Sequence, residues 1–316
     1  MFSVVIPVYL NEQGIPALLE ALTELNRGMK GELEAVLVVD GSPDRSFELL
    51  SDALPTAPFR SQLLLLSRNF GSFAAIRAGL AHARGELFAV LAADLQEPPE
   101  LVSAFRERLL AGDCDIVVGT RAARHDGIGQ RSFSAIFWGL YRGLVQAQMP
   151  RGGVDVFACN RDARDALLAL RESNTTLVGL LVWMGFRRAE ISYVRRRREH
   201  GRSAWSFSRR LRYFADSVFA FSDLPIRLLT IAGAAGIVLS VALGGVVLVA
   251  KLWGKIPVPG YTVTVLTVVF FGGLNSLGLG LVGEYVWRTF ENSKERPTFL
   301  VARRRTFGEE ERDERQ

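Results

Sequence analysis

The chain lacks the features that build disulfide-rich or cysteine-ligated metal folds. Among its 316 residues only Cys114 and Cys159 are cysteines, and they do not have the spacing of metal ligands. The N-terminus also lacks the basic segment of a signal peptide, because polar Asn11 and Glu12 follow a short apolar run. No internal repeat is visible. The first residues are therefore expected to form a strand of a folded domain.

Charged residues are absent from two long apolar stretches, Leu228–Ala250 and Thr262–Gly283. Each is longer than the roughly 18 to 20 residues with which a helix crosses the hydrocarbon of a bilayer. A short segment with Pro257, Pro259 and Gly260 separates them. The sequence therefore predicts a transmembrane hairpin. The region before it, about 225 residues, is long enough to bury a core.

Positive charge is concentrated on both sides of this hairpin and is sparse inside it. The net charge is +5, and only Lys251 and Lys255 lie between the two apolar stretches. Such asymmetry places the basic flanks, and with them the N-terminal domain, in the cytoplasm. In that reducing compartment no disulfide is expected. Basic clusters beside a membrane favour anionic lipid headgroups as partners, and they argue against nucleic acid.

Before the hairpin, short apolar runs alternate with segments of helical periodicity. Strands are expected at 2–8, 34–39, 63–66, 87–92, 116–118, 154–159 and 191–195, and helices at 14–27, 72–84, 98–110, 132–146, 161–170 and 176–184. Strands that are apolar throughout indicate an α/β fold with a mostly parallel sheet, covered on both faces. Ligands bind such sheets at the carboxyl ends of the strands. Asp40 and Asp94 both follow strands, so this edge is the predicted site.

The segment Trp205–Phe221 combines aromatic residues with arginines. An aromatic face with basic flanks suits a helix in the membrane interface, and the alternative is a packing helix of the soluble domain. The predicted organisation is a cytoplasmic domain over 1–204, an interfacial amphipathic region over 205–226, the hairpin over 227–290 and a charged tail over 291–316. The end of the tail, Thr306–Gln316, is expected to be disordered.

Six motifs in order resemble one enzyme family. They are VVIPVYLNE (Val4–Glu12), VDGSPD (Val39–Asp44), SRNFGSFAAIRAGLAHARGE (Ser67–Glu86), ADLQEPPE (Ala93–Glu100), VVGTR (Val117–Arg121) and HGRSAW (His200–Trp205). Together with the hairpin, they are similar to family 2 glycosyltransferases of the polyprenyl-phosphate type, such as dolichyl-phosphate mannose synthases and bacterial undecaprenyl-phosphate glucosyltransferases. The resemblance runs from about residue 3 to residue 290 and implies the GT-A fold.

A nucleotide-sugar donor carries a diphosphate whose negative charge has to be stabilised as it leaves. A carboxylate at a strand end can bind a divalent cation that bridges to such phosphates. The resemblance assigns this catalytic and metal-binding role, with Mg²⁺ or Mn²⁺, to Asp94 and Gln96. The alternative for Asp94 is a cap of the helix that follows Pro98.

The resemblance also implies a nucleotide pocket and a set of phosphate contacts. Asp40 would hold the nucleoside, unless it is only a turn residue before Gly41. Arg77 is either a phosphate contact or a solvated helix residue. The pocket would be lined by Pro7, Tyr9, Glu12 and Asp40. The donor or acceptor phosphates would be bound by Arg121, Arg124, Arg198, Arg202 and Ser203. The alternative for the charge run with Arg198, Arg202 and Ser203 is a solvated face.

Two positions and one segment depart from the family pattern. Val39 and Ala92 stand where the family usually has an acid, and the segment 155–158 differs where a Gly-Asp-Phe-Arg segment is usual. A missing carboxylate weakens metal or nucleotide binding, and the altered segment puts sugar recognition in doubt. Glu284, the one acid near the end of the second apolar stretch, is expected to reach for Arg288.

The expected function is inverting transfer of a hexose-type sugar from a nucleotide-diphosphate sugar to a polyprenyl phosphate, with undecaprenyl phosphate as the expected carrier. The product would serve cell-envelope glycan or lipopolysaccharide modification at the bacterial inner membrane, in a multi-pass protein. The alternatives are a transferase to a lipid-linked or polysaccharide hydroxyl, which needs a catalytic base, and a catalytically degenerate membrane scaffold. A homo-oligomer is compatible with the sequence, which determines neither the oligomeric state, the sugar nor the base.

Overall fold

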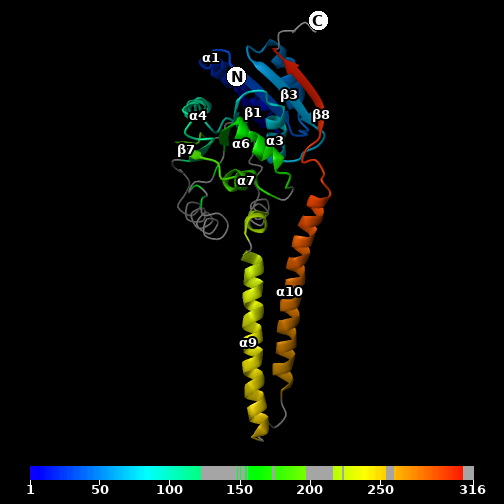
Figure 1. Ribbon diagram of the computed structural model, residues 1–316. Coiled ribbons are helices and arrows are strands. Elements are labelled where there is room, and N and C mark those ends of the chain that lie inside the picture. Colours follow the sequence, from blue (N-terminus) through cyan, green and yellow to red (C-terminus); the bar gives the residue numbers. More distant parts are fainter. Residues whose placement is uncertain are drawn as a thin grey trace.

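In the part of the chain that the structure describes, an eight-stranded sheet forms the centre of the domain (Figure 1), with the strand order β7-β5-β6-β4-β1-β2-β3-β8. This computed structural model describes residues 1–121, 148, 150, 154, 156–172, 175–196, 216–222, 224–253 and 260–308. The strands are β1 (Phe2–Val8), β2 (Leu33–Val39), β3 (Arg60–Leu66), β4 (Leu87–Val90), β5 (Ile116–Arg121), β6 (Val156–Asn160), β7 (Arg188–Tyr193) and β8 (Val301–Phe307).

The sheet is mixed but mostly parallel, as the sequence predicts. β1 pairs in parallel with β2 and β4, β2 with β3, and β5 with β7. β6 runs antiparallel to both β4 and β5, so those two strands share one direction. β8 is antiparallel to β3. The carboxyl ends of β1, β2, β3, β4, β5 and β7 therefore lie at a single edge.

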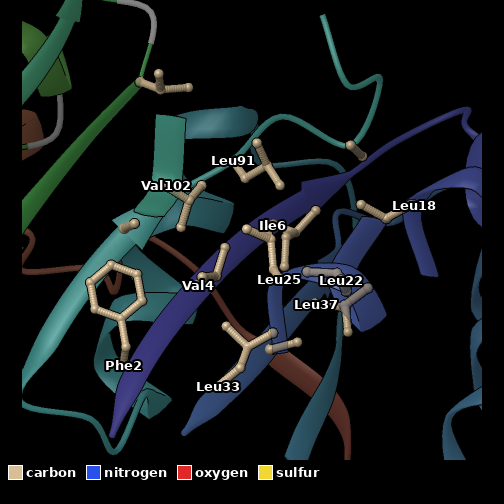
Figure 2. Packing of buried hydrophobic residues seen from close by; sticks show 14 of the residues in the cluster. Phe2, Val4, Ile6, Leu18, Leu22, Leu25, Leu33, Leu37, Leu91 and Val102 are labelled. Carbon is tan, nitrogen blue, oxygen red and sulfur yellow. The ribbon is translucent and has the colours of Figure 1, made fainter. Parts of the chain in front are cut away.

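Helices cover both faces of this sheet. The alternate residues Phe2, Val4 and Ile6 of β1 pack in one cluster, shown in Figure 2, whereas Val5 belongs to the cluster on the opposite face. The first cluster is completed by α1 (Ile15–Gly28), α2 (Ser46–Ala53) and α4 (Glu100–Leu110), and the second by α3 (Ser72–His82), α6 (Arg161–Ala169) and α7 (Leu177–Trp183). Strands buried on both faces explain the continuous apolar runs in the sequence.

Two long antiparallel helices project from this domain side by side (Figure 1). They are α9 (Leu224–Leu252) and α10 (Tyr261–Ser293), and they extend the two predicted apolar stretches at both ends. The helices touch where small residues face large ones, since a Cβ on Gly278 would lie 3.4 Å from Leu229 and one on Gly236 would lie 2.9 Å from Phe271. Among the residues whose side chains are described, no helix meets the length and apolarity of a membrane crossing.

Residues 216–221 are helical and join α10 to the domain. Arg288 of α10 donates to Asp216 over 2.9 Å and to Glu284 over 2.8 Å, so the expected pairing of Glu284 with Arg288 is present. On the domain side Phe221 packs so closely on α7 that a Cβ on Gly179 would lie 2.2 Å from its ring. This part of the predicted interfacial region therefore packs on the domain. Residues 205–215 lie outside the described part of the chain.

The chain after α10 returns to the sheet, which differs from the expected charged tail over 291–316. β8 pairs with β3 along its length, Phe307 packs against one core cluster, and Val301 packs against the other. Backbone pairing and these two apolar ends outweigh the charge of Arg303, Arg304 and Arg305, which stay exposed. Exposed charge is a usual protection of an edge strand against further pairing.

Removing β8 is expected to destabilise the domain. Truncation after Ser293 exposes the apolar edge of β3 and removes the packing of Val301 and Phe307, which should cost about 2–4 kcal/mol and promote aggregation. Truncation after Gly308 leaves β8 in place and is the matched control. Melting temperature and gel filtration of the two truncated proteins check this, and equal behaviour would show that β8 contributes nothing.

Candidate functional site

The carboxyl edge of the sheet gathers the polar residues that the sequence singles out. Tyr9 follows β1, Asp40 follows β2, Asp94 follows β4, and Arg121 ends β5. Arg195 follows β7, the parallel neighbour of β5. Five strands thus bring acidic, aromatic and basic side chains to one edge, which is where ligands bind in α/β sheets.

Hydrogen bonds join the loops after β1 and β2. Ser42 accepts from the backbone N–H of Leu10 over 2.9 Å, and Asp44 accepts from the N–H of Glu12 over 3.1 Å. Glu12 in turn accepts from the N–H of Arg45 over 3.1 Å. Leu10 has a φ of 51°, an unfavourable conformation for a residue with a side chain. Of the predicted nucleotide-pocket residues, Glu12 therefore joins the two loops, whereas Tyr9 is 39% exposed beside them.

Asp44 makes this junction sensitive to acid. Burial by itself raises the pKa of Asp44, but hydrogen bonds led by those from Ser42 and Ser46 hold it below its ordinary value of 3.8. Because the pKa is lower in the folded state, ionised Asp44 stabilises the fold above that ordinary value, and the contribution is lost as pH falls through the lowered pKa.

Asp44→Asn is accordingly expected to cost about 1 kcal/mol of stability at pH 7 and much less near pH 3. Melting temperatures of both proteins across this range test the effect. A difference between them that does not shrink in acid would contradict the assignment.

The side chain of Asp40 is hydrogen-bonded to the loop between β3 and α3. Its two carboxylate oxygens accept the backbone N–H groups of Phe70 and Gly71, each over 2.8 Å, and its side chain is buried. Burial raises the pKa of Asp40, and the two N–H groups and the charge of Arg68 partly oppose that rise. Gly71 precedes α3, so Asp40 fixes the start of this helix. The nucleoside role implied by the resemblance has no direct support in these contacts.

Glycine is required immediately after Asp40. Gly41 has a φ of 56°, and a Cβ there would lie 2.2 Å from the backbone carbon of Arg68. The loop after β3 therefore presses directly on the turn after β2. The Asp-Gly pair serves both the turn and the loop that crosses it.

Asp94 occupies a tight turn after β4. Leu95 donates its N–H to Ala92 over 3.2 Å and has a φ of 51°. The N–H of Gln96 donates to Oδ1 of Asp94 over 3.3 Å, and Nδ2 of Asn11 donates to the carbonyl oxygen of Ala93 over 3.0 Å. The turn is thus tied to the loop after β1. Asp94 does not cap the following helix, because the N-cap of α4 is Pro99, without a side-chain bond.

The described residues fit a divalent cation only if the ligand completes the coordination. They contain no group of three or more His, Cys, Asp or Glu side chains that could hold a metal ion. Oε1 of Gln96, the predicted second ligand, accepts from Nη2 of Arg195 over 2.6 Å. Mg²⁺ commonly uses one or two carboxylates together with substrate phosphates. The half-buried Asp94 carboxylate fits that mode, whereas Gln96 is engaged elsewhere.

Of the five predicted phosphate contacts, the structure describes the position of Arg121 alone. Arg121 lies at the carboxyl end of β5, at the same edge as Asp94. The remaining predicted contacts lie outside the described residues: Arg124, Arg198, Arg202 and Ser203. Arg77 is not a solvated helix residue, because it is buried and donates to the carbonyl oxygens of Leu168 in α6 and Leu170 just after it. Burial lowers the pKa of its guanidinium.

The sequence did not predict that Arg195 and Arg196 contact the acidic turn after β4, which carries Asp94 and Glu97. Both are visible in the basic run after β7, but their partners Gln96, Glu97 and Glu100 lie about a hundred residues earlier. The only local signal was the excess of acidic residues after Asp94. A parallel β5–β7 pair was needed to bring the two segments together.

The fold is that of an α/β protein, and its candidate ligand site lies at the carboxyl ends of the strands, where the turn with Asp94 and Glu97 lies beside Arg195 and Arg196. The chain belongs to glycosyl transferase family 2, whose family model matches residues 3–172, more than half of the chain. The resemblance seen in the six motifs is thereby confirmed.

Relatives match over nearly the whole chain. An undecaprenyl-phosphate 4-deoxy-4-formamido-L-arabinose transferase from Pseudomonas aeruginosa is 35% identical over 309 residues, 96% of this chain and 90% of that protein. The corresponding transferase from Klebsiella pneumoniae is 32% identical, over 95% and 92%. The putative glycosyltransferase CsbB from Bacillus subtilis is 32% identical, over 95% and 91%. The similarity therefore extends through the two long helices.

Solved structures show a more distant likeness. A mannosyltransferase from Pyrobaculum calidifontis, in complex with GDP-Man and Mn²⁺, is 17% identical over 88% of this chain and 86% of that one, with a TM-score of 0.46. Mannosyl-3-phosphoglycerate synthase from Rubrobacter xylanophilus is 15% identical over 74% and 75%, with a TM-score of 0.49.

Proposed function

We propose that this glycosyltransferase moves a sugar, with inversion, from a nucleotide-diphosphate sugar to a polyprenyl phosphate at the bacterial inner membrane. The observation that carries the proposal is that Asp94, Arg121 and Arg195 all follow or end strands at the carboxyl edge of the sheet, in a domain continuous with a long apolar hairpin. Relatives that are named as undecaprenyl-phosphate sugar transferases align through both of these parts.

The donor side of the reaction is assigned to the turn after β4 and the loops beside it. Asp94 would hold Mg²⁺ or Mn²⁺, which when bound neutralises the diphosphate as it leaves. Tyr9, exposed after β1, would contact the nucleoside, with Pro7 of the same strand beside it, and Asp40 would shape the pocket by fixing the loop before α3. Arg121 would contact a phosphate at the same edge.

The acceptor needs alignment more than activation. A phosphate monoester has a second pKa of about 6, so its oxygen is largely ionised at neutral pH and can attack without a strong base. The residues at the edge would then contribute orientation and charge neutralisation. Arg124, Arg198, Arg202 and Ser203 remain our proposal for the phosphate contacts beyond the described residues.

The hairpin would place this edge at a bilayer. No residue from Leu228 to Ala250 is charged. Large apolar side chains that α9 and α10 expose include Leu228, Ile231, Val238, Leu239, Val241, Val246, Val249, Val268, Phe270, Leu277, Leu279 and Val282. An exposed apolar surface of this extent indicates contact with lipid or protein. An apolar cleft of about 540 Å³ opens between the helices and is lined by Leu229, Leu281 and Tyr285, among others. We propose the isoprenoid carrier and the surrounding lipids as the partners of this apolar hairpin.

A direct assay tests this function. Purified full-length protein in detergent is incubated with undecaprenyl phosphate, Mn²⁺ or Mg²⁺ and a panel of nucleotide sugars, and the lipid product is weighed by mass spectrometry. We expect one polyprenyl-phosphate sugar. Transfer only to hydroxyl acceptors would favour the alternative enzyme. No transfer, together with no stabilisation by nucleotide diphosphates, would favour a scaffold, which the missing acids at Val39 and Ala92 allow.

A further inference from the structure

The chain that follows β7 crosses the turn after β4 and is bonded to it. The backbone N–H of Arg196 donates to the carbonyl oxygen of Gln96 over 2.8 Å, and Nε2 of Gln96 donates to the carbonyl oxygen of Arg196 over 3.5 Å. Nη2 of Arg195 donates to Oε1 of Gln96 over 2.6 Å. Both the backbone and the side chain of Gln96 are therefore held by this crossing segment.

Glu97 lies next to this crossing and is almost fully buried, with 2% of its side chain exposed. Nε of Arg195 lies 3.5 Å from Oε1 of Glu97, and the hydroxyl of Tyr193 lies 3.4 Å from the same atom. A buried carboxylate is stable only beside a positive charge or hydrogen-bond donors. Arg195 supplies that charge, so one guanidinium holds two consecutive residues of the turn.

Asp94 depends on the same turn for its orientation. The N–H of Gln96 donates to Oδ1 of Asp94, and Leu95 between them has a positive φ. A conformation of this kind persists only where the surroundings hold it. On the C-terminal side of the turn, the contacts that the structure describes at Gln96 come from Arg195 and Arg196.

We propose that Arg195 is a positioning residue of the donor site. It acts through Gln96 and Glu97 to hold the Asp94 carboxylate in the orientation that binds the metal and diphosphate of the donor. The inference rests on the proposed function, because it takes Asp94 to be the ligand of a metal-bound nucleotide diphosphate. It also reassigns Gln96, whose side-chain oxygen serves Arg195.

Arg196 provides the matched comparison within the same segment. Its side chain is 53% exposed and lies 3.2 Å from Glu100, which is 73% exposed. Exposed ion pairs contribute little to stability. Arg195 and Arg196 thus carry the same charge to the same turn, but only Arg195 reaches the buried side of it. A positioning role predicts a large difference between them, whereas a general effect of basic charge predicts none.

The test measures binding and catalysis of the full-length protein in detergent. Mn²⁺ binding is followed by electron paramagnetic resonance in the presence of UDP or GDP, whichever raises the melting temperature of the wild-type protein. Arg195→Ala is expected to weaken this binding by about tenfold, the lower end of the loss seen when a direct outer partner of a metal ligand is removed, because Arg195 acts on Asp94 through Gln96 and Glu97. It should also lower kcat. Arg196→Ala should stay within about twofold of the wild type, and Arg195→Lys should restore part of the loss.

A second variant separates positioning from folding. Arg195→Ala removes a cation that lies 3.5 Å from the buried Glu97 carboxylate. Arg195→Ala is therefore also combined with Glu97→Gln, so that both charges are removed. This double variant should melt near the wild-type temperature and still bind Mn²⁺ and nucleotide about tenfold more weakly. Wild-type binding by the double variant, or an equal loss in Arg196→Ala, would overturn the role of Arg195. A wild-type protein that neither binds nor transfers would instead remove the proposed function and this inference with it.

Discussion

Asp94→Ala is expected to reduce sugar transfer on the order of 10³-fold, because several kcal/mol of charge stabilisation on the leaving diphosphate would be lost. The turn itself should persist, since it is held by Leu95, Gln96 and Asn11 through bonds that do not need the carboxylate. The melting temperature without nucleotide should therefore change little. Initial rates with a saturating donor, and the melting temperature with and without Mn²⁺ and nucleotide, measure both quantities.

A matched control for Asp94 is Asp52→Ala, which removes an exposed carboxylate from α2, away from the carboxyl edge. It should transfer sugar at the wild-type rate. Asp94→Asn keeps the shape and the acceptor oxygen but removes the charge, so a loss close to that of Asp94→Ala would show that charge is what matters. Unchanged turnover in Asp94→Ala would eliminate the metal role of this residue.

Asp40→Ala is expected to destabilise the domain even in the absence of nucleotide. The change leaves the N–H groups of Phe70 and Gly71 without the carboxylate that accepts both of them in a buried place. Losing such bonds costs about 2–4 kcal/mol, which lowers the melting temperature of a domain of this size by roughly 5–10 °C. Thermal unfolding of the apo protein measures the effect directly.

The same experiment separates two roles for Asp40. A residue that only contacts the nucleoside would leave apo stability unchanged and weaken nucleotide binding alone, and that result would contradict the role in the loop described here. Asp40→Asn keeps one acceptor but turns a donor toward the second N–H group. It should therefore remain less stable than the wild type, though less severely affected than Asp40→Ala.

Much of the fold follows from local sequence patterns. The first strand is predicted at 2–8 and found at Phe2–Val8, and the helices at 72–84 and 98–110 are found with shifted ends. Apolar runs and turn residues are read within a few neighbours, so they need no tertiary information. β8 escaped prediction because its arginines resemble those of a solvated tail. The segment becomes a strand because it pairs with the edge of β3.

The candidate site, like the fold, could be predicted only in part. The sequence shows that polar residues follow apolar strands, and this pattern placed Asp40 and Asp94 at one edge. The sequence also shows six motifs in family order, which is enough for the family. It does not show which carboxylate is engaged, because the partners of Asp40 lie about 30 residues away and those of Gln96 about 100.

The amino-acid sequence alone therefore determined the alternation of strands and helices, the two long apolar stretches and the edge of the sheet where chemistry is expected. Each of these depends on periodicity and turn chemistry among near neighbours. Tertiary structure decided that Asp40 supports a loop, that Gln96 is held by Arg195 and that the C-terminal segment completes the sheet. These outcomes depend on which distant segments the parallel strands bring side by side, and no local pattern encodes that.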